Sequence, residues 1–220
     1  MIYRWFFFIL FGFLFGSILF SKSVPKLLLS KDVTNESSDK NPGAANVFIH
    51  CGIKCGIFCL FLDMLKGFLP VFIAKYYLNI ENPLFSLVIF APSLGHGLGL
   101  FYKFRGGKCI ATFFGTMIAL LPYSYIGFLL AFLYILFSTG IKISPNSRRS
   151  IITFSLYIII SLSILIPLKK YSVAIGTSLC SVLAIIKHLI APNKRKEQKN
   201  CENYSKNRTN PKRENSIQKL

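Results

Sequence analysis

The chain carries more apolar sequence than one soluble domain of its length can bury. Hydrophobic residues fill 53% of its 220 positions, 22 of them phenylalanine, whereas charged residues fill only 15%. A single soluble core of this size cannot hide that much apolar surface, but a lipid bilayer can. The sequence therefore predicts an integral membrane protein.

Seven hydrophobic runs approach the roughly 17–25 residues that a helix needs to cross the hydrocarbon core. They lie at about 4–20, 56–78, 84–101, 110–123, 125–140, 151–168 and 171–188. The fourth and fifth runs are short, so the stretch 110–140 is the one that could be tilted, broken or re-entrant. We expect an all-α, polytopic helical bundle with about seven transmembrane helices, and a first helix that is retained rather than cleaved.

The placement of the basic residues predicts the orientation of this bundle. If the N-terminus lies outside, most of the 26 lysines and arginines fall on the inner side. The outer side keeps Arg4, Lys75, Lys169 and Lys170, and Lys66 lies within a span. Because positively charged flanks stay in the cytoplasm, we expect an N-out, C-in topology. The protein would then be a multi-pass membrane protein.

The composition changes near residue 190 and divides the chain into two parts. Residues 1–190 hold the hydrophobic runs, and residues 191–220 are basic with almost nothing to bury. The second part is predicted to be a disordered cytoplasmic tail attracted to anionic lipid headgroups. Its one aromatic residue, Tyr204, offers no platform for stacked bases, so nucleic-acid binding is not expected.

Two opposite charges stand inside the second hydrophobic run. Asp63 and Lys66 are three residues apart, so on a helix their side chains share a face and can pair. Charges within a membrane span are expensive and need a reason. The pair is either a structural ion pair or a device that positions Lys66 for an anionic substrate.

A polar turn, residues 41–47, precedes that run. Gly43 can adopt positive φ, Pro42 fixes one dihedral angle, and Asn41 and Asn46 supply amide donors. Such a turn at a helix start can direct several N–H groups at a phosphate oxygen. By itself the sequence Asn-Pro-Gly is also a good ordinary turn.

A second polar loop, residues 103–108, combines glycine with positive charge. Gly106 and Gly107 let a ligand approach the backbone, and Lys103, Arg105 and Lys108 supply charge for a phosphate. Cys109 stands where a nucleotide-binding P-loop requires serine or threonine, which excludes that motif. An ordinary positively charged inner loop is the alternative.

Two further segments could complete a phosphate site. Ser147 lies beside Arg148 and Arg149 in a third inner loop, and it is either part of a phosphate cradle or of a charged connector. His188 ends the last hydrophobic run next to Lys187, where a histidine is either functional or a polar helix cap.

These motifs together resemble one known family. The segments Asn41-Pro-Gly-Ala-Ala-Asn-Val47, Asp63-Met-Leu-Lys-Gly67, and Gly95-His96 followed by Phe104-Arg-Gly-Gly-Lys108 are similar to the bacterial membrane glycerol-3-phosphate acyltransferases that use acyl phosphate. The resemblance implies acyl transfer to the 1-hydroxyl of glycerol 3-phosphate, giving lysophosphatidic acid, without a metal or cofactor. It implies acyl phosphate, glycerol 3-phosphate and membrane lipids as partners.

The same resemblance assigns roles to individual residues. The implied catalytic residues are His96, Asn41, Asn46 and His188. The implied phosphate-binding residues are Gly43, Lys66, Arg105, Gly106, Gly107, Lys108 and Ser147.

The chain departs from the family pattern at three positions. Asp39 and Ile49 stand where the first motif has serine and arginine, and Ala191 stands where the third motif has asparagine. Asp39 would repel a phosphate group unless the neighbouring Lys40 screens its negative charge. A catalytically silent family member and a transporter of a phosphorylated metabolite therefore stay open as alternatives.

Overall fold

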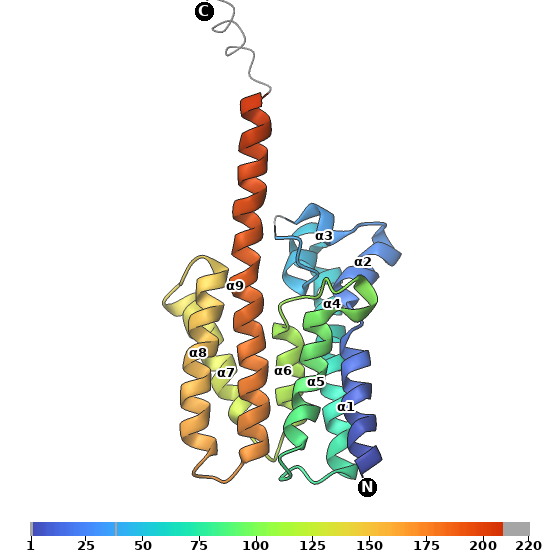
Figure 1. Ribbon diagram of the computed structural model, residues 1–220, viewed down its shortest axis with the longest axis vertical. Coiled ribbons are helices and arrows are strands. Elements are labelled where there is room, and N and C mark those ends of the chain that lie inside the picture. The colour runs from blue at the N-terminus through green and yellow to red at the C-terminus, as the bar shows by residue number, and fades with distance from the viewer. Residues whose placement is uncertain (1, 38, 209–220) are drawn as a thin grey trace, which may run out of the picture.

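The computed structural model describes the backbone of residues 2–37 and 39–208, and within these ranges it contains helices and connecting turns but no strand (Figure 1). The α-helices are α1 (Ile2–Gly16), α2 (Phe20–Leu29), α3 (Val33–Glu36), α4 (Ala44–Tyr77), α5 (Phe85–Leu98), α6 (Ile110–Ala119), α7 (Ile126–Ile135), α8 (Asn146–Leu165) and α9 (Tyr171–Arg208). A 3-10 turn, η1 (Leu100–Tyr102), follows α5, and a π-helical turn, η2 (Leu136–Gly140), extends α7. The prediction of an all-α bundle is confirmed.

Within the described residues, four helical segments are long and apolar enough to cross a membrane: α4, α5 with η1, α8, and residues 171–190 of α9. The pair α1 and α2, bent by 42° at the break between them, is a fifth candidate if it counts as one span. The segments α6 and α7–η2 are shorter, which agrees with the expectation that 110–140 is irregular. The count of seven spans and the N-out orientation stay predictions.

Two helices differ in length from the hydrophobic runs that predict them. α4 begins at Ala44, not near residue 56, because the helix continues on both sides of a kink at one non-helical residue, Gly52, with φ of 81°. α9 continues to Arg208, beyond the hydrophobic run that ends near residue 188. The disorder expected for residues 191–220 stays a prediction. Residues 209–220 of that tail lie outside the described residues, and the domain boundary stays a prediction.

The loops divide between the two ends of the bundle. The N-terminus and the α4–α5 and α8–α9 turns lie at one end, whereas α2, α3, the loop after α5 and the α7–α8 connection lie at the other (Figure 1). This second end, called the basic end below, carries the polar motifs of 41–47 and 103–108. The expectation that these motifs share one side of the protein is confirmed.

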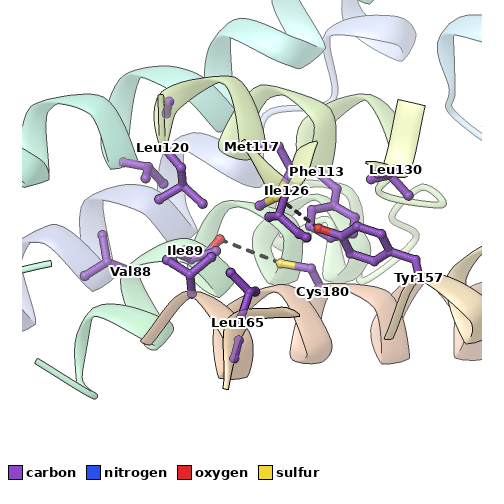
Figure 2. Packing of buried hydrophobic residues seen from close by; sticks show 14 of the residues in the cluster. Val88, Ile89, Phe113, Met117, Leu120, Ile126, Leu130, Tyr157, Leu165 and Cys180 are labelled. Atoms are coloured by element: carbon purple, nitrogen blue, oxygen red, sulfur yellow. Dashed lines mark hydrogen bonds between the residues drawn. The ribbon is translucent and has the colours of Figure 1, made fainter. Parts of the chain in front are cut away.

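The apolar core is built from residues of α1, α4, α5, α6, α7, α8 and α9, and Figure 2 shows part of it. Fully buried aromatic rings of Phe113 and Tyr157 pack edge to face, with centroids 6.0 Å apart. Polar atoms in this core find partners, because the Tyr157 hydroxyl donates to the Met117 sulfur at 3.6 Å and the Cys180 thiol donates to the Ile89 carbonyl at 3.8 Å. Core packing thereby joins helices that lie far apart in the sequence.

Close helix contacts depend on glycine. A Cβ added at Gly16 would lie 2.2 Å from the Pro92 carbonyl oxygen, and one at Gly95 would lie 2.1 Å from the Phe13 carbonyl oxygen, so α1 and α5 touch backbone to backbone. The same holds for α4 and α6, where a Cβ at Gly67 would lie 2.1 Å from the Thr112 carbonyl oxygen. Gly12 and Gly16, four residues apart on α1, both lie against Pro92 of α5, because small residues permit such close approach.

Replacing Gly16 by alanine should therefore destabilise the fold. The added methyl group meets backbone rather than a flexible side chain, and overpacking of this kind costs about 1–3 kcal/mol. Gly12→Ala is the matched control on the same helix, since its Cβ would lie 3.3 Å from the Pro92 ring. Thermal unfolding in detergent should show a lower midpoint for Gly16→Ala than for Gly12→Ala, and equal midpoints would contradict the α1–α5 contact.

Candidate functional site

The site begins with the break between α1 and α2. Residues 17–19 are not helical, although they continue an apolar run, and this leaves backbone groups without helical partners inside the bundle. Lys66 of α4 donates its Nζ to the Ile18 carbonyl oxygen at 2.5 Å and pairs with Asp63 at 2.8 Å. Ser21, in the first turn of α2, donates to the other Asp63 oxygen at 2.5 Å. The predicted pairing of Asp63 and Lys66 is confirmed, and it fixes the direction in which α2 leaves α1.

This arrangement gives Lys66 a different place from the one that its predicted phosphate-binding role requires. Its side chain is fully buried between the carboxylate of Asp63 and the Ile18 carbonyl. It is not among the residues that line the cavity at the basic end. These contacts match the structural alternative, in which the ion pair supplies a hydrogen-bond partner for a backbone carbonyl at the helix break.

Beyond α2, the chain crosses the basic end and returns to α4 through the loop 37–43. Asp39 organises this loop, since its Oδ1 accepts hydrogen bonds from the Asn41 backbone N–H at 3.2 Å and from Asn46 Nδ2 at 2.9 Å. Asn46 also donates to the Asn41 carbonyl oxygen at 2.8 Å. Gly43 is the N-cap of α4, so the polar turn leads into a helix start as expected.

The glycine-rich loop lies directly against the end of α5. The Gly107 N–H donates to the His96 carbonyl oxygen at 3.0 Å, and a Cβ at Gly107 would lie 2.2 Å from His96 Nε2. A Cβ at Gly106 would lie 2.2 Å from the Gly97 carbonyl oxygen. The two glycines therefore allow the loop to close over α5, and the Gly107 N–H bonds to protein instead of pointing at a ligand.

One ion pair connects the two polar loops. Lys108 Nζ lies 2.8 Å from Asp39 Oδ2, across 69 residues of sequence. Among the hydrogen bonds described for this loop, none joins Lys40 to Asp39. A second link joins α2 to η1, because the hydroxyl groups of Ser23 and Tyr102 are hydrogen-bonded.

A cavity of about 410 Å³ opens between these loops and residues 187–190 of α9. It is lined by Lys22, Thr34, Asn35, Asp39, Lys40, Asn41, Arg105, Gly106, Gly107, Lys108, Lys187 and Ile190. Five of these residues are basic and one is acidic, so the cavity suits an anion such as a phosphate group. Its size fits a small polar molecule.

Asp39 keeps its negative charge in this setting. Burial by itself would raise the pKa of its carboxyl group, but the hydrogen bond and positive charge of Lys108, together with the Asn46 and Asn41 donors, lower that pKa below its ordinary value. The carboxylate is therefore ionised at neutral pH and offsets part of the positive charge of the cavity.

The two predicted catalytic histidines lie behind the cavity lining. His96 is 4% exposed beneath Gly107, and its Nδ1 has no hydrogen-bond partner among the described residues. His188 is 2% exposed, and within the described part of the chain neither of its ring nitrogens has a hydrogen-bond partner. His188 follows Lys187, a residue that lines the cavity, in α9.

The structure brings together about half of the predicted site. Asn41, Arg105, Gly106, Gly107 and Lys108 line the cavity, whereas the remaining predicted residues do not: Asn46, Gly43, Lys66, His96, His188 and Ser147. Asn46, Gly43 and the histidines contact or adjoin lining residues, and Ser147 is partly buried in the first turn of α8.

Seven lining residues were not assigned to the site from sequence: Lys22, Thr34, Asn35, Asp39, Lys40, Lys187 and Ile190. The three lysines were partly indicated by the sequence, because they belong to the basic residues expected on one side of the membrane. Nothing in the sequence indicated Thr34 and Asn35, since their position depends on the short helix α3.

Comparison with known proteins identifies the family. The sequence model described as "Glycerol-3-phosphate acyltransferase" matches residues 6–195. Glycerol-3-phosphate acyltransferase 2 of Thermotoga maritima is 35% identical over 184 residues, which cover 84% of this chain and 89% of the relative. This chain belongs to the glycerol-3-phosphate acyltransferase family.

Other members of the glycerol-3-phosphate acyltransferase family match shorter segments. The Maridesulfovibrio salexigens enzyme is 40% identical over 119 residues, which span 54% of this chain but only 60% of the relative's length. The chain likewise resembles the crystal structure of PlsY (YgiH), an integral membrane glycerol 3-phosphate acyltransferase, in its glycerol 3-phosphate form. That match has a TM-score of 0.72 and 27% identity, and it covers 86% of this chain and 90% of PlsY. The membrane bundle is thus a shared property of the family.

Removing Lys66 should destabilise this acyltransferase-family fold more than removing an exposed lysine of the same helix. Lys66→Met leaves Asp63 buried without its cation and the Ile18 carbonyl without its donor, and breaking a buried pair costs about 3–5 kcal/mol. Lys54→Met is the control, since Lys54 is exposed on α4, and its effect should stay within about 0.5 kcal/mol. Thermal unfolding in detergent measures both. Equal unfolding temperatures for the two variants would refute the role assigned to the pair.

Proposed function

We propose that this chain transfers an acyl group from acyl phosphate to the 1-hydroxyl of glycerol 3-phosphate, giving lysophosphatidic acid at the cytoplasmic face of the bacterial inner membrane. The observation that carries the proposal is the basic cavity at one end of a membrane bundle of this family. Both substrates carry a phosphate group, and the cavity presents ammonium, guanidinium and amide donors from separate loops.

The proposed reaction needs no covalent enzyme intermediate. The glycerol hydroxyl oxygen attacks the acyl carbon, the bond between that carbon and the phosphate oxygen breaks, and inorganic phosphate leaves. The hydroxyl proton passes to a base, which is the leaving phosphate or a neutral histidine. Because acyl phosphate is already activated, the protein chiefly orients the two substrates and neutralises their charges.

The lining residues divide naturally between binding and catalysis in this proposal. Lys108 and Arg105 bind phosphate, and Asn41 orients the reacting groups from the opposite loop. His96 and His188 lie behind the lining, where their buried ring nitrogens can accept or orient a proton once a substrate enters. The acyl chain extends into the lipid beside the apolar helices.

Lys108→Ala should lower kcat/KM for lysophosphatidate formation by about 10- to 100-fold, because a charge-assisted hydrogen bond contributes about 1.5–3 kcal/mol. The assay mixes purified protein with acyl phosphate and glycerol 3-phosphate and measures lysophosphatidate. Lys103→Asn is the matched control in the same loop. Lys103 is exposed, does not line the cavity, and has a φ of 55° that asparagine tolerates.

Two results would contradict the proposal. Wild-type protein that forms no lysophosphatidate would instead support a catalytically silent family member. A loss of the same size in Lys103→Asn would mean that general positive charge, and not the Lys108 contact, supports turnover.

A further inference from the structure

Asp39 satisfies three donors that a phosphate group would also use. Its Oδ2 accepts from Lys108 Nζ at 2.8 Å, and its Oδ1 accepts from Asn46 Nδ2 at 2.9 Å and from the Asn41 N–H at 3.2 Å. These donors are an ammonium, a carboxamide and a backbone amide, and they come from the α5–α6 loop, the start of α4 and the turn before it. One carboxylate thus holds together the anion-binding groups of both polar loops.

We infer that Asp39 is an internal anion that occupies a phosphate-binding position, and that a phosphate monoester or acyl phosphate binds by displacing its carboxylate from Lys108. Asp39 would then determine how tightly the cavity binds phosphate. The inference rests on the proposed function for the identity of the ligand, although the contacts of Asp39 do not depend on any activity.

The exposure of the ion pair permits this exchange. The side chains of Asp39 and Lys108 are 17% and 19% exposed, and both line the cavity, so an incoming ligand reaches both groups. A phosphate monoester carries nearly two negative charges at neutral pH against one on the carboxylate. The four other basic lining residues favour the more highly charged anion, which can therefore compete for Lys108.

A direct role of Asp39 as general base fits these contacts less well. A carboxylate that accepts several hydrogen bonds and pairs with an ammonium group is stabilised in its charged form, so it is a weak proton acceptor. Its contacts are instead those of a bound anion. Asp39 is accordingly a positioning and affinity-determining residue, not one that reacts.

The decisive variant is Asp39→Asn, which keeps the shape of the side chain and removes its charge. Asparagine can still accept from the Asn41 N–H, but its neutral amide does not hold the ammonium group of Lys108. We expect glycerol 3-phosphate or inorganic phosphate to bind the variant about tenfold more tightly than wild type, the order of one charge-assisted hydrogen bond. Isothermal titration of the full-length protein in lipid nanodiscs measures this without turnover.

Asp32→Asn is the matched control. Asp32 lies in the same crossing segment, pairs with Lys22 at 3.6 Å and caps α3 through the Thr34 N–H at 3.0 Å, but it does not line the cavity. Both substitutions remove one negative charge from the basic end, and asparagine is also a good N-cap. If the effect is specific to Asp39, the gain in phosphate affinity is therefore larger in Asp39→Asn than in Asp32→Asn.

Each outcome bears on the inference. Tighter binding of glycerol 3-phosphate assigns the position to the acceptor's phosphate, and tighter binding of inorganic phosphate when glycerol 3-phosphate is saturating assigns it to the donor's. Weaker or unchanged binding in Asp39→Asn, or an equal gain in Asp32→Asn, overturns the displacement. Asp39→Ser should change binding in the same direction, and it replaces Asp39→Asn if that variant fails to fold.

The binding experiment also separates this inference from the proposed function. If wild-type protein makes no lysophosphatidate while Asp39→Asn binds phosphate more tightly, the proposed reaction is refuted and the internal-anion role of Asp39 is supported. Conversely, if the wild type is active but its phosphate affinity does not change on substitution of Asp39, the reaction is supported and the internal-anion role is refuted. Under the inference, kcat is expected to change much less than KM in Asp39→Asn.

Discussion

The hydrogen bond from Lys66 to the Ile18 carbonyl holds the basic end of the protein in place. A break in a helix at membrane depth leaves backbone groups that water cannot reach, and such groups need an internal partner. Lys66 supplies that partner, and Asp63 compensates its charge while also accepting from Ser21 on the far side of the break. Two charges that are costly inside a membrane thereby stabilise a bend that a continuous helix could not make. α2 and the loops after it consequently reach across the end of the bundle.

The site also requires that neighbouring helices approach closely, and glycine residues make this possible. Backbone contact of α1 with α5 and of α4 with α6 brings α4 and α5, which carry or adjoin the polar motifs, closer to their neighbours than larger side chains would allow. The loop 103–108 then closes over His96 because Gly106 and Gly107 have no side chains. Much of the glycine content that suggested ligand binding thus serves packing, and the packing positions the charged residues that face the cavity.

Sequence patterns predicted those parts of the protein that depend on local properties. The segments α5, α8 and the membrane part of α9 follow from continuous apolar runs, and Asn41, Arg105 and Lys108 follow from motifs whose residue types suit phosphate. The break at 17–19 could not be predicted, because Ile18 and Leu19 are ordinary membrane residues by type. The partner of Asp39 could not be predicted for a similar reason: Lys40 is adjacent in sequence, but Lys108 is the residue that pairs with Asp39 in space. Helix packing, and not local propensity, decides between the two.

The presence of Asp39 in this cavity has a consistent electrostatic explanation. Cations gathered from α2, the loop before α4, the α5–α6 loop and α9 repel one another when no anion is between them. A carboxylate among these cations reduces the repulsion, and its ion pair keeps Lys108 directed at the opposite loop. The same carboxylate must yield to a substrate that offers more charge. A site built in this way is already arranged when the substrate arrives, and its affinity is lowered by the strength of the contact that arranges it. The orientation of Lys108 and the affinity of the cavity for phosphate are therefore coupled through the Asp39–Lys108 ion pair.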